Sequence, residues 1–183
     1  GQLVASVLSK KIAAGSTHVV LDLPVGPTAK LRDAEAAARL AQRLKHTASA
    51  FGLTVEIVET DGTQPVGRGI GPVLEARDVL AVLRNDPAAP SDLRARALTL
   101  SGRLLELAGA AAAPGGGLDM AKSLLSNGAA WRKFQSICAA QGGMQGLSFA
   151  PYRHDVVALR AGQITSIDNR KLAKVAKLAG APR

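Results

Sequence analysis

The residues of this sequence that are best suited to chemistry are a hydroxyl, an ammonium group and a carboxylate. Ser6 and Lys10 lie four positions apart in a segment with helical character, so their side chains share one face of a helix. A hydroxyl beside an ammonium group can bind a carbonyl-rich heterocycle or a phosphate. Asp61 lies just past a predicted strand, beside Gly62. A carboxylate there, if it lines a pocket, can protonate a leaving heterocycle or orient a substrate.

Each of these residues also has a purely structural interpretation. Ser6 and Lys10 suit the exposed face of a helix, and Asp61 suits an Asx turn that caps its own loop. The segment 67–71 has the spacing G-x-G-x-G rather than the G-x-G-x-x-G of dinucleotide sites, which favours a tight turn with exposed backbone groups. The one cysteine, Cys138, excludes a disulfide framework and a cysteine-based zinc site.

Two strands with a helix between them must position these groups. Residues 17–26 contain an apolar run that ends at a proline and a glycine, which predicts a buried strand of a parallel sheet. Residues 34–50 predict an amphipathic helix, and the alternating, β-branched residues 53–59 predict a second strand. In such a βαβ unit the loops after both strands, 24–30 and 60–71, meet at the edge where open α/β sheets bind ligands.

The rest of the chain is predicted to be mainly helical. Further helices are expected at residues 3–14, 72–83, 91–107, 118–126, 129–140 and 169–180. In the helix 91–107 the leucines, Leu104 among them, are expected to face inward. Segments 155–160 and 163–168 are strand-like and flank a two-residue Ala-Gly turn, so a β-hairpin is expected there.

The composition is that of a basic globular protein. The 183 residues suit one domain or one and a half, and 47% of them are hydrophobic and 20% charged. The net charge of +9 favours anionic partners: nucleic acid, phosphorylated small molecules or phosphate. Because the charge is dispersed and only five residues are aromatic, a nucleic-acid-binding domain is the weaker interpretation. No apolar run approaches the roughly 20 residues of a membrane-spanning helix.

Several ordered segments resemble the thymidine and pyrimidine-nucleoside phosphorylases. Residues 5–11, ASVLSKK, are similar to that family's A-S-I-L-S-K-K segment. Residues 60–75 begin TDGTQPVG and are similar to its T-D-M-x-Q-P-L-G…G-N-x-L-E-V block. Residues 18–30 and 67–72 resemble one branch, which holds the type 2 thymidine phosphorylases and the AMP phosphorylases. The resemblance covers essentially the whole chain.

The resemblance implies an α/β fold with a mixed, largely parallel sheet flanked by helices, as in the large domain of nucleoside phosphorylases. Residues 2–15 would then be the last helix of a small all-α domain. Residues 16–183 would be part of the large α/β domain, in a protein that is longer at both ends. Family members are homodimers that act across the cleft between the two domains, so we expect a cytoplasmic homodimer without membrane or nucleic-acid partners.

The resemblance also implies a pentosyltransferase activity, with inorganic phosphate as co-substrate and no organic cofactor. The favoured reaction converts thymidine and phosphate into thymine and 2-deoxyribose 1-phosphate. The alternative, AMP phosphorylase, converts AMP and phosphate into adenine and ribose 1,5-bisphosphate. The family's phosphate-binding K-x-S-x-G-G-x-G-D loop is absent from this sequence. These 183 residues alone are therefore predicted to be inactive.

The resemblance assigns roles to individual residues. Ser6 and Lys10 match the pair that contacts the pyrimidine carbonyl and ring nitrogen, where a cation stabilises negative charge on the departing base. Asp61 matches the aspartate proposed as proton donor in the AMP-cleaving relatives. The family also has a monovalent-cation site, made by two loop carbonyls and a helix carboxylate. In this sequence the corresponding positions are Val66, Gly69 and Asp78. Asp78 takes the place of a Glu in the pyrimidine enzymes.

Overall fold

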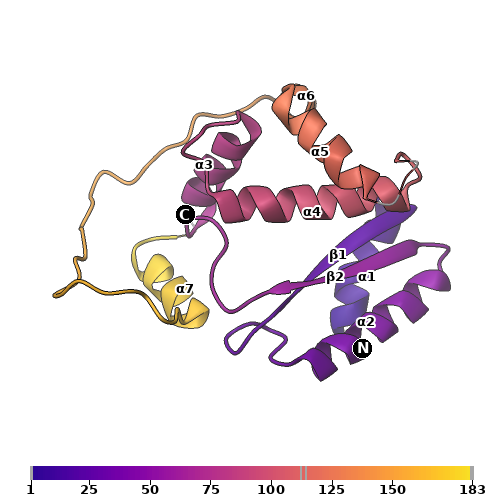
Figure 1. Ribbon diagram of the computed structural model, residues 1–183, viewed down its shortest axis with the longest axis horizontal. Coiled ribbons are helices and arrows are strands. Elements are labelled where there is room, and N and C mark those ends of the chain that lie inside the picture. The colour runs from indigo at the N-terminus through magenta and orange to yellow at the C-terminus, as the bar shows by residue number, and fades with distance from the viewer. Residues whose placement is uncertain (1, 112, 114, 182–183) are drawn as a thin grey trace.

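The computed structural model describes residues 2–111, 113 and 115–181 (Figure 1). The elements follow one another as α1 (Gln2–Ala13), β1 (His18–Val25), α2 (Ala34–Ser49), β2 (Thr54–Asp61), α3 (Pro72–Leu83), α4 (Ser91–Leu107), α5 (Gly116–Ser126), α6 (Ala129–Ala140) and α7 (Asn169–Leu178). Among the residues described, none of the helices combines the length and the apolar character that crossing a bilayer requires.

The two strands form the predicted βαβ unit. Strands β1 and β2 pair in parallel, in a register that runs from His18 opposite Thr54 to Val25 opposite Asp61. The connecting helix α2 is capped by Asp33, which precedes its first residue and whose side chain accepts the Ala36 N–H at 2.7 Å. The chain is therefore an α/β protein built on a small parallel sheet, as the sequence predicted.

Helices cover both faces of this sheet. Helix α4 crosses one face, and α1 and α2 lie on the other (Figure 1). The core lies on the α1–α2 side, where Leu8 and Leu44 are almost completely buried, with exposures of 2% and 1%. Burying one leucine side chain stabilises a fold by about 1.5–3 kcal/mol, so α1 is firmly held against the sheet. The predicted domain boundary after residue 15 remains a prediction.

Helices α4 and α5 cross through two glycines. Gly102 is the buried residue of α4, and a Cβ atom built on Gly117 would lie 2.1 Å from the Gly102 carbonyl oxygen. The two backbones are therefore in direct contact. The prediction that Leu104 faces inward is wrong in this packing, since its side chain is 40% exposed while the small Gly102 takes the contact.

We expect Gly117→Ala to lower the free energy of unfolding by about 1–3 kcal/mol, because a methyl group has no room at this crossing. Gly116→Ala is the matched control, since its Cβ would come no closer than 3.7 Å to the nearest side chain. Urea denaturation of both variants measures the difference. Equal stability of the two variants would show that α4 and α5 separate at little cost.

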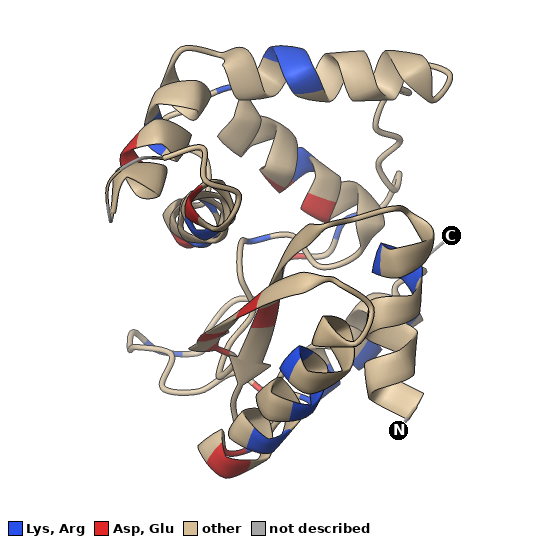
Figure 2. Ribbon diagram, turned by 90° about the vertical axis from the view of Figure 1, so that its right-hand side faces the viewer, with Lys and Arg blue, Asp and Glu red and all other residues tan. Residues whose placement is uncertain are grey.

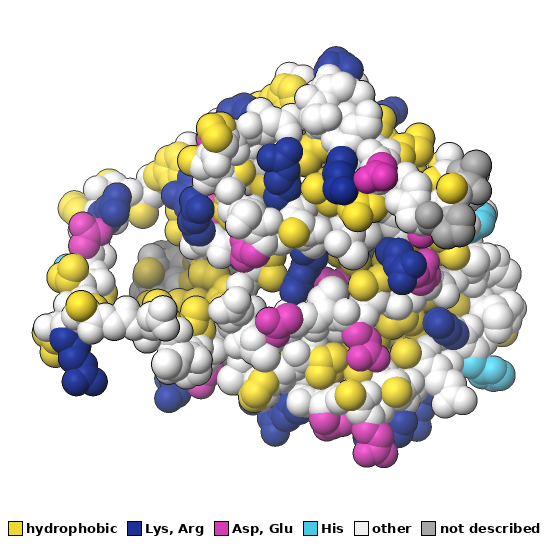
Figure 3. Space-filling model, in the orientation of Figure 1, with side chains coloured by type: hydrophobic (Ala, Val, Ile, Leu, Met, Phe, Trp, Pro, Cys, Tyr) yellow, Lys and Arg dark blue, Asp and Glu magenta, His cyan; other side chains and the backbone are white. Residues whose placement is uncertain are grey.

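The segment between α6 and α7 differs from the sequence prediction. The hairpin expected over residues 155–168 is not formed among the described residues, which have no regular secondary structure there. Val156, Leu159 and Ile164 are 90%, 106% and 83% exposed, and hydrophobic side chains line this extended arm in Figure 3. A two-stranded hairpin needs another element to cover its apolar face, and the described residues place none against it.

Candidate active site

The two strand-end loops meet at a pair of glycines. The Gly62 N–H donates to the Val25 carbonyl oxygen at 2.8 Å, directly after the strands end. A Cβ atom on Gly26 would lie 2.5 Å from the carbonyl group of Gly62, and one on Gly62 would lie 3.0 Å from the backbone of Pro24. Only glycine allows this approach without displacement of backbone. The two candidate loops therefore lie at the carboxyl edge of the sheet, as predicted, and in addition they contact each other there.

A cavity of about 570 Å³ lies beside these loops, at the carboxyl end of β1. Leu3 and Val7 of α1 form part of one wall, and Leu21 and Leu23 of β1 form another. The remaining lining residues come from the loop after β1, from α2 and from the start of α7. The lining residues with polar side chains on this side of the sheet are Thr28, Lys30 and Asn169, while the side chain of Asp22 points to the α4 side. The cavity thus offers an apolar enclosure with a few convergent polar groups, which is typical of small-molecule sites.

Asp22 is tied into a polar network that sequence reasoning missed. The Thr60 hydroxyl donates to Asp22 Oδ1 at 2.5 Å, and Arg96 Nη1 lies 3.7 Å from Asp22 Oδ2. Arg96 also donates through Nη2 to the backbone oxygen of Asp61 at 2.6 Å. One guanidinium group of α4 therefore links the ends of both strands. No local sequence pattern predicts this contact, since α4 is distant from both strands in the sequence.

Ser6 and Lys10 lie on α1, the helix that contributes Leu3 and Val7 to the cavity wall. Both side chains are exposed on α1 and do not line the cavity themselves. Helical spacing places Lys10 only about 20° around the axis from Leu3, which does line it. The rise of 1.5 Å per residue also puts Lys10 about 10 Å further along the axis than Leu3, towards the end of α1 that leads into the start of β1.

Asp61 is the last residue of β2 and is engaged with its own loop. Its Oδ1 accepts the Thr63 N–H at 2.8 Å, which confirms the Asx turn that the sequence offered as one alternative. Hydrogen bonds from the Thr63 hydroxyl and N–H, and then the positive charge of Arg96, lower the pKa of Asp61. The side chain is exposed and does not line the cavity. The structure thus does not bring Ser6, Lys10 and Asp61 into this cavity together.

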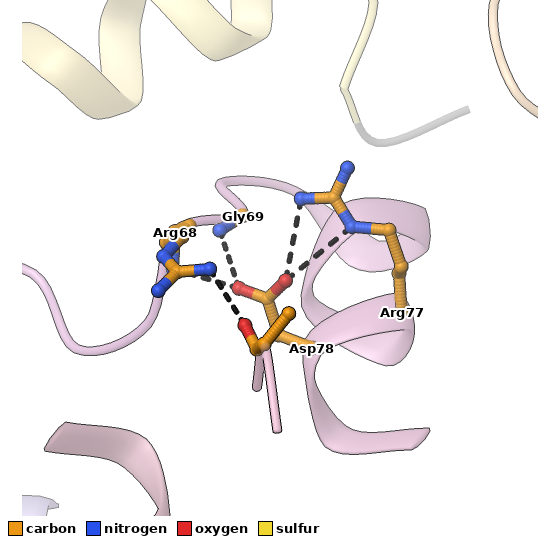
Figure 4. A network of polar contacts seen from close by, with 5 residues as sticks. Arg68, Gly69, Arg77 and Asp78 are labelled. Atoms are coloured by element: carbon orange, nitrogen blue, oxygen red, sulfur yellow. Dashed lines mark hydrogen bonds and ion pairs between the residues drawn. The ribbon is translucent and has the colours of Figure 1, made fainter. Parts of the chain in front are cut away.

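Asp78 organises the glycine-containing loop that leads into α3 (Figure 4). Its Oδ2 accepts the N–H groups of Arg68 at 2.7 Å and Gly69 at 2.6 Å, and Oδ1 lies 3.2 Å from Arg77 Nη2. Burial raises the pKa of Asp78, but the hydrogen bonds from Arg68, Gly69 and Arg77 outweigh it and leave the pKa lowered. Asp78 is the one buried charged residue among those described, with an exposure of 5%.

These contacts bear on the predicted cation site at Val66, Gly69 and Asp78. The structure brings Gly69 and Asp78 together, and Val66 lies half-buried at the start of the same loop. Both carboxylate oxygens of Asp78 face N–H donors, which makes their surroundings positive and unfavourable for a cation. The described residues contain no group of three or more His, Cys, Asp or Glu side chains suited to a metal ion. The cation site at these three residues therefore stays a prediction.

Comparison with known proteins gives a consistent result. No family model matches the chain. It is 61% identical over 182 residues to "Putative thymidine phosphorylase" of Polaromonas sp. strain JS666, covering 100% of the chain and 35% of that protein. It is 61% identical to "Putative thymidine phosphorylase 1" of Cupriavidus necator, with the same two shares. It is 57% identical over 183 residues to the protein named "Putative thymidine phosphorylase" in Legionella pneumophila strain Corby, again with 100% and 35% covered.

The chain therefore spans about 35% of the length of the curated relatives it matches. The matched segment holds both strand-end loops, the residues around the cavity and all three candidate substrate residues. Since identity of this degree runs through the whole chain, we conclude that the chain is homologous to one segment of these proteins, which are named for thymidine phosphorylase.

Proposed function

We propose that the protein containing this chain is a pentosyltransferase that cleaves a pyrimidine nucleoside with inorganic phosphate. The observation that carries this proposal is the 61% identity, over the whole chain, to proteins named for thymidine phosphorylase. The cavity at the carboxyl end of β1 adds an apolar surface for a small ligand in the same segment, apart from the Ser6–Lys10 pair that we assign to the base.

In this reaction a phosphate oxygen forms a bond to C1′ of the sugar as the bond between C1′ and the base nitrogen breaks. The electron pair of the broken bond moves onto the base, so negative charge develops on its carbonyl oxygens. Lys10 supplies a positive charge to stabilise that base, and the Ser6 hydroxyl donates a hydrogen bond beside it. The departing base takes up the proton that the attacking hydrogen phosphate gives up, so the products are the free base and a pentose 1-phosphate. The groups that hold phosphate are proposed to lie outside these residues.

A second candidate reaction is the phosphorolysis of AMP, which needs a further anion site for the 5′-phosphate. Lys30 favours this candidate, because an exposed ammonium group at the cavity wall can pair with a phosphate. Steady-state assays of the complete protein with thymidine, uridine and AMP separate the two reactions. Turnover of AMP alone would reject the pyrimidine reaction, and no turnover of any of the three would reject nucleoside phosphorolysis altogether.

Nucleic-acid binding is not proposed. Lys and Arg are distributed over several helices in Figure 2, and on the face seen in Figure 3 they alternate with Asp and Glu. A nucleic-acid site concentrates positive charge along one face or one groove. Binding that weakens steeply with added salt would revive this interpretation.

The variant Asp61→Asn separates a catalytic role of Asp61, as a proton donor, from its structural role in the turn. The amide oxygen of Asn can still accept the Thr63 N–H, so the turn is kept while the acidic proton is lost. For thymidine we expect kcat to change by less than about threefold, because the departing pyrimidine is stabilised as an anion by the positive charge of Lys10 and not by a proton from Asp61.

For AMP, proton donation to the purine by Asp61 predicts a loss of about 100-fold or more in the same variant. Thr63→Val is the matched control for the turn, since it removes only the hydroxyl that bonds the carboxylate. A large and equal loss for both substrates would contradict a proton-donor role and assign Asp61 to the structure of the loop.

A further inference from the structure

The start of α7 lies against both strand-end loops, although it is more than 100 residues away in the sequence. Asn169 Nδ2 donates to the Gly62 carbonyl oxygen at 3.0 Å. Arg170 donates through Nε to the Thr28 carbonyl oxygen at 3.3 Å and through Nη2 to that of Ala29 at 3.4 Å. Two consecutive residues of one helix thus connect the loop after β1 with the turn after β2.

The first turn of α7 is itself well held. Asp168 caps the helix, because its Oδ1 accepts the N–H groups of Arg170 and Lys171, both at 3.0 Å. The Asn169 N–H also lies 3.4 Å from the Thr28 hydroxyl. Among the described residues, Asn169 Oδ1 is a buried side-chain oxygen with no hydrogen-bond partner. Since such an atom carries a cost, the contacts of Asn169 with the two loops are what maintain its position.

The loop that receives these contacts forms part of the cavity wall. Within the loop, the Gly26 N–H donates to the Leu31 carbonyl at 3.0 Å and the Ala29 N–H donates to the Gly26 carbonyl at 3.0 Å. These bonds close the loop but leave the carbonyl oxygens of Thr28 and Ala29 to Arg170. Thr28 and Ala29 line the cavity, and so does Asn169 itself.

We propose that Asn169 and Arg170 are positioning residues that hold residues 26–31 and the turn at Gly62 in the arrangement that forms this cavity wall. Neither side chain needs to touch the substrate, because each acts through the loop backbone. The consequence for substrate binding rests on the proposed function, whereas the effect on the loop does not.

Three variants of the complete protein test the proposal. Asn169→Asp keeps the size of the side chain but sets a carboxylate oxygen against the Gly62 carbonyl in place of the amide donor. A negative charge in the first turn favours a helix, so α7 itself is not weakened. Arg170→Ala removes the two bonds to the loop after β1. Lys174→Ala removes a positive charge from an exposed position of the same helix and is the control.

The first measurement is backbone amide hydrogen exchange. In Asn169→Asp and Arg170→Ala we expect about tenfold faster exchange at Gly26, Ala29 and Gly62, with exchange in α4 unchanged. Lys174→Ala should match the wild-type protein at all of these amides. Wild-type exchange at all three amides in both variants would overturn the proposal, and so would an equal acceleration throughout the chain.

The second measurement separates positioning from general loss of structure. A loosened cavity wall is expected to raise KM for the nucleoside about fivefold with a smaller change in kcat, whereas partial unfolding lowers apparent kcat at constant KM. Arg170→Lys should recover little of the wild-type KM, because one ammonium group does not reproduce the paired contact with two carbonyls. Faster loop exchange with wild-type KM in both variants would overturn the link to the substrate. If the wild-type protein catalyses no phosphorolysis, the proposed function is rejected. The hydrogen-exchange result then still tests whether Asn169 and Arg170 hold the two loops.

Discussion

Replacing Lys10 by Ala in the complete protein is expected to lower kcat/KM for thymidine about 100-fold while the protein stays folded. In the proposed reaction the base departs with an electron pair, and the ammonium group is the positive charge of this chain assigned to stabilise it. The side chain of Lys10 is exposed, and α1 is anchored by the buried Val4 and Leu8, so the substitution removes no core contact. Phosphorolysis kinetics and thermal unfolding of the same preparations measure both effects.

Two further variants make the Lys10 result specific. Lys11→Ala removes the neighbouring positive charge, which lies about 100° away around the helix, and should retain most of the activity. Lys10→Arg keeps the charge but replaces a compact ammonium group with a planar guanidinium, so partial activity is expected. An unchanged rate in Lys10→Ala would remove this residue from the base site.

The largest effect on stability is expected for Asp78→Ala, at about 3–5 kcal/mol of the free energy of unfolding. The substitution leaves the N–H groups of Arg68 and Gly69 without their acceptor and Arg77 without its partner, in a place where Asp78 is only 5% exposed. Urea denaturation measures the loss. Asp119→Ala is the control, because Asp119 is an exposed acidic residue in a surface ion pair and its loss should cost under about 1 kcal/mol.

Asp78→Asn adds a test by pH, because the amide keeps the shape of the side chain and one acceptor oxygen for Arg68 and Gly69, but loses the charge and faces Arg77 with an NH2 group. The pKa of Asp78 in the folded chain is lowered from the ordinary 3.8, so the charge contributes stability that is fully present above that value. This contribution is lost as the pH falls through the lower, folded-state pKa. The stability gap between wild type and Asp78→Asn should therefore be constant from about pH 7 to 5 and narrow below about pH 4. A gap that widens on acidification would contradict this assignment.

Features that depend on a few neighbouring residues could be predicted from the sequence. Asp33 caps α2 and Pro72 begins α3, because capping and proline geometry act within one helical turn. The Asx turn at Asp61 spans two residues and was likewise among the alternatives. The hairpin over residues 155–168 was wrong, because alternation describes the faces of a strand and says nothing about whether a partner lies beside it.

Contacts between distant segments could not be predicted in the same way. Asn169 meets Gly62 across 107 positions, and Arg96 meets the backbone of Asp61 across 35. Neither contact leaves a periodicity or a spacing in the sequence, since each exists only once the strands, α4 and α7 are packed. The edge of the sheet that holds the cavity was predictable, because it follows from the direction of two parallel strands. The residues that complete its wall were not.

The cavity wall depends on the covalent continuity of the exposed arm that precedes α7. Nearly every residue from 141 to 168 is exposed, and the arm swings out before it returns to the strand-end loops (Figure 1). The arm acts as a covalent linker, which keeps α7 at a high effective concentration near the two strand-end loops that it contacts. After a single proteolytic cut in the arm, α7 would have to bind the two loops as a separate chain, in a bimolecular reaction. The shape of the cavity would then vary with the dilution of the protein.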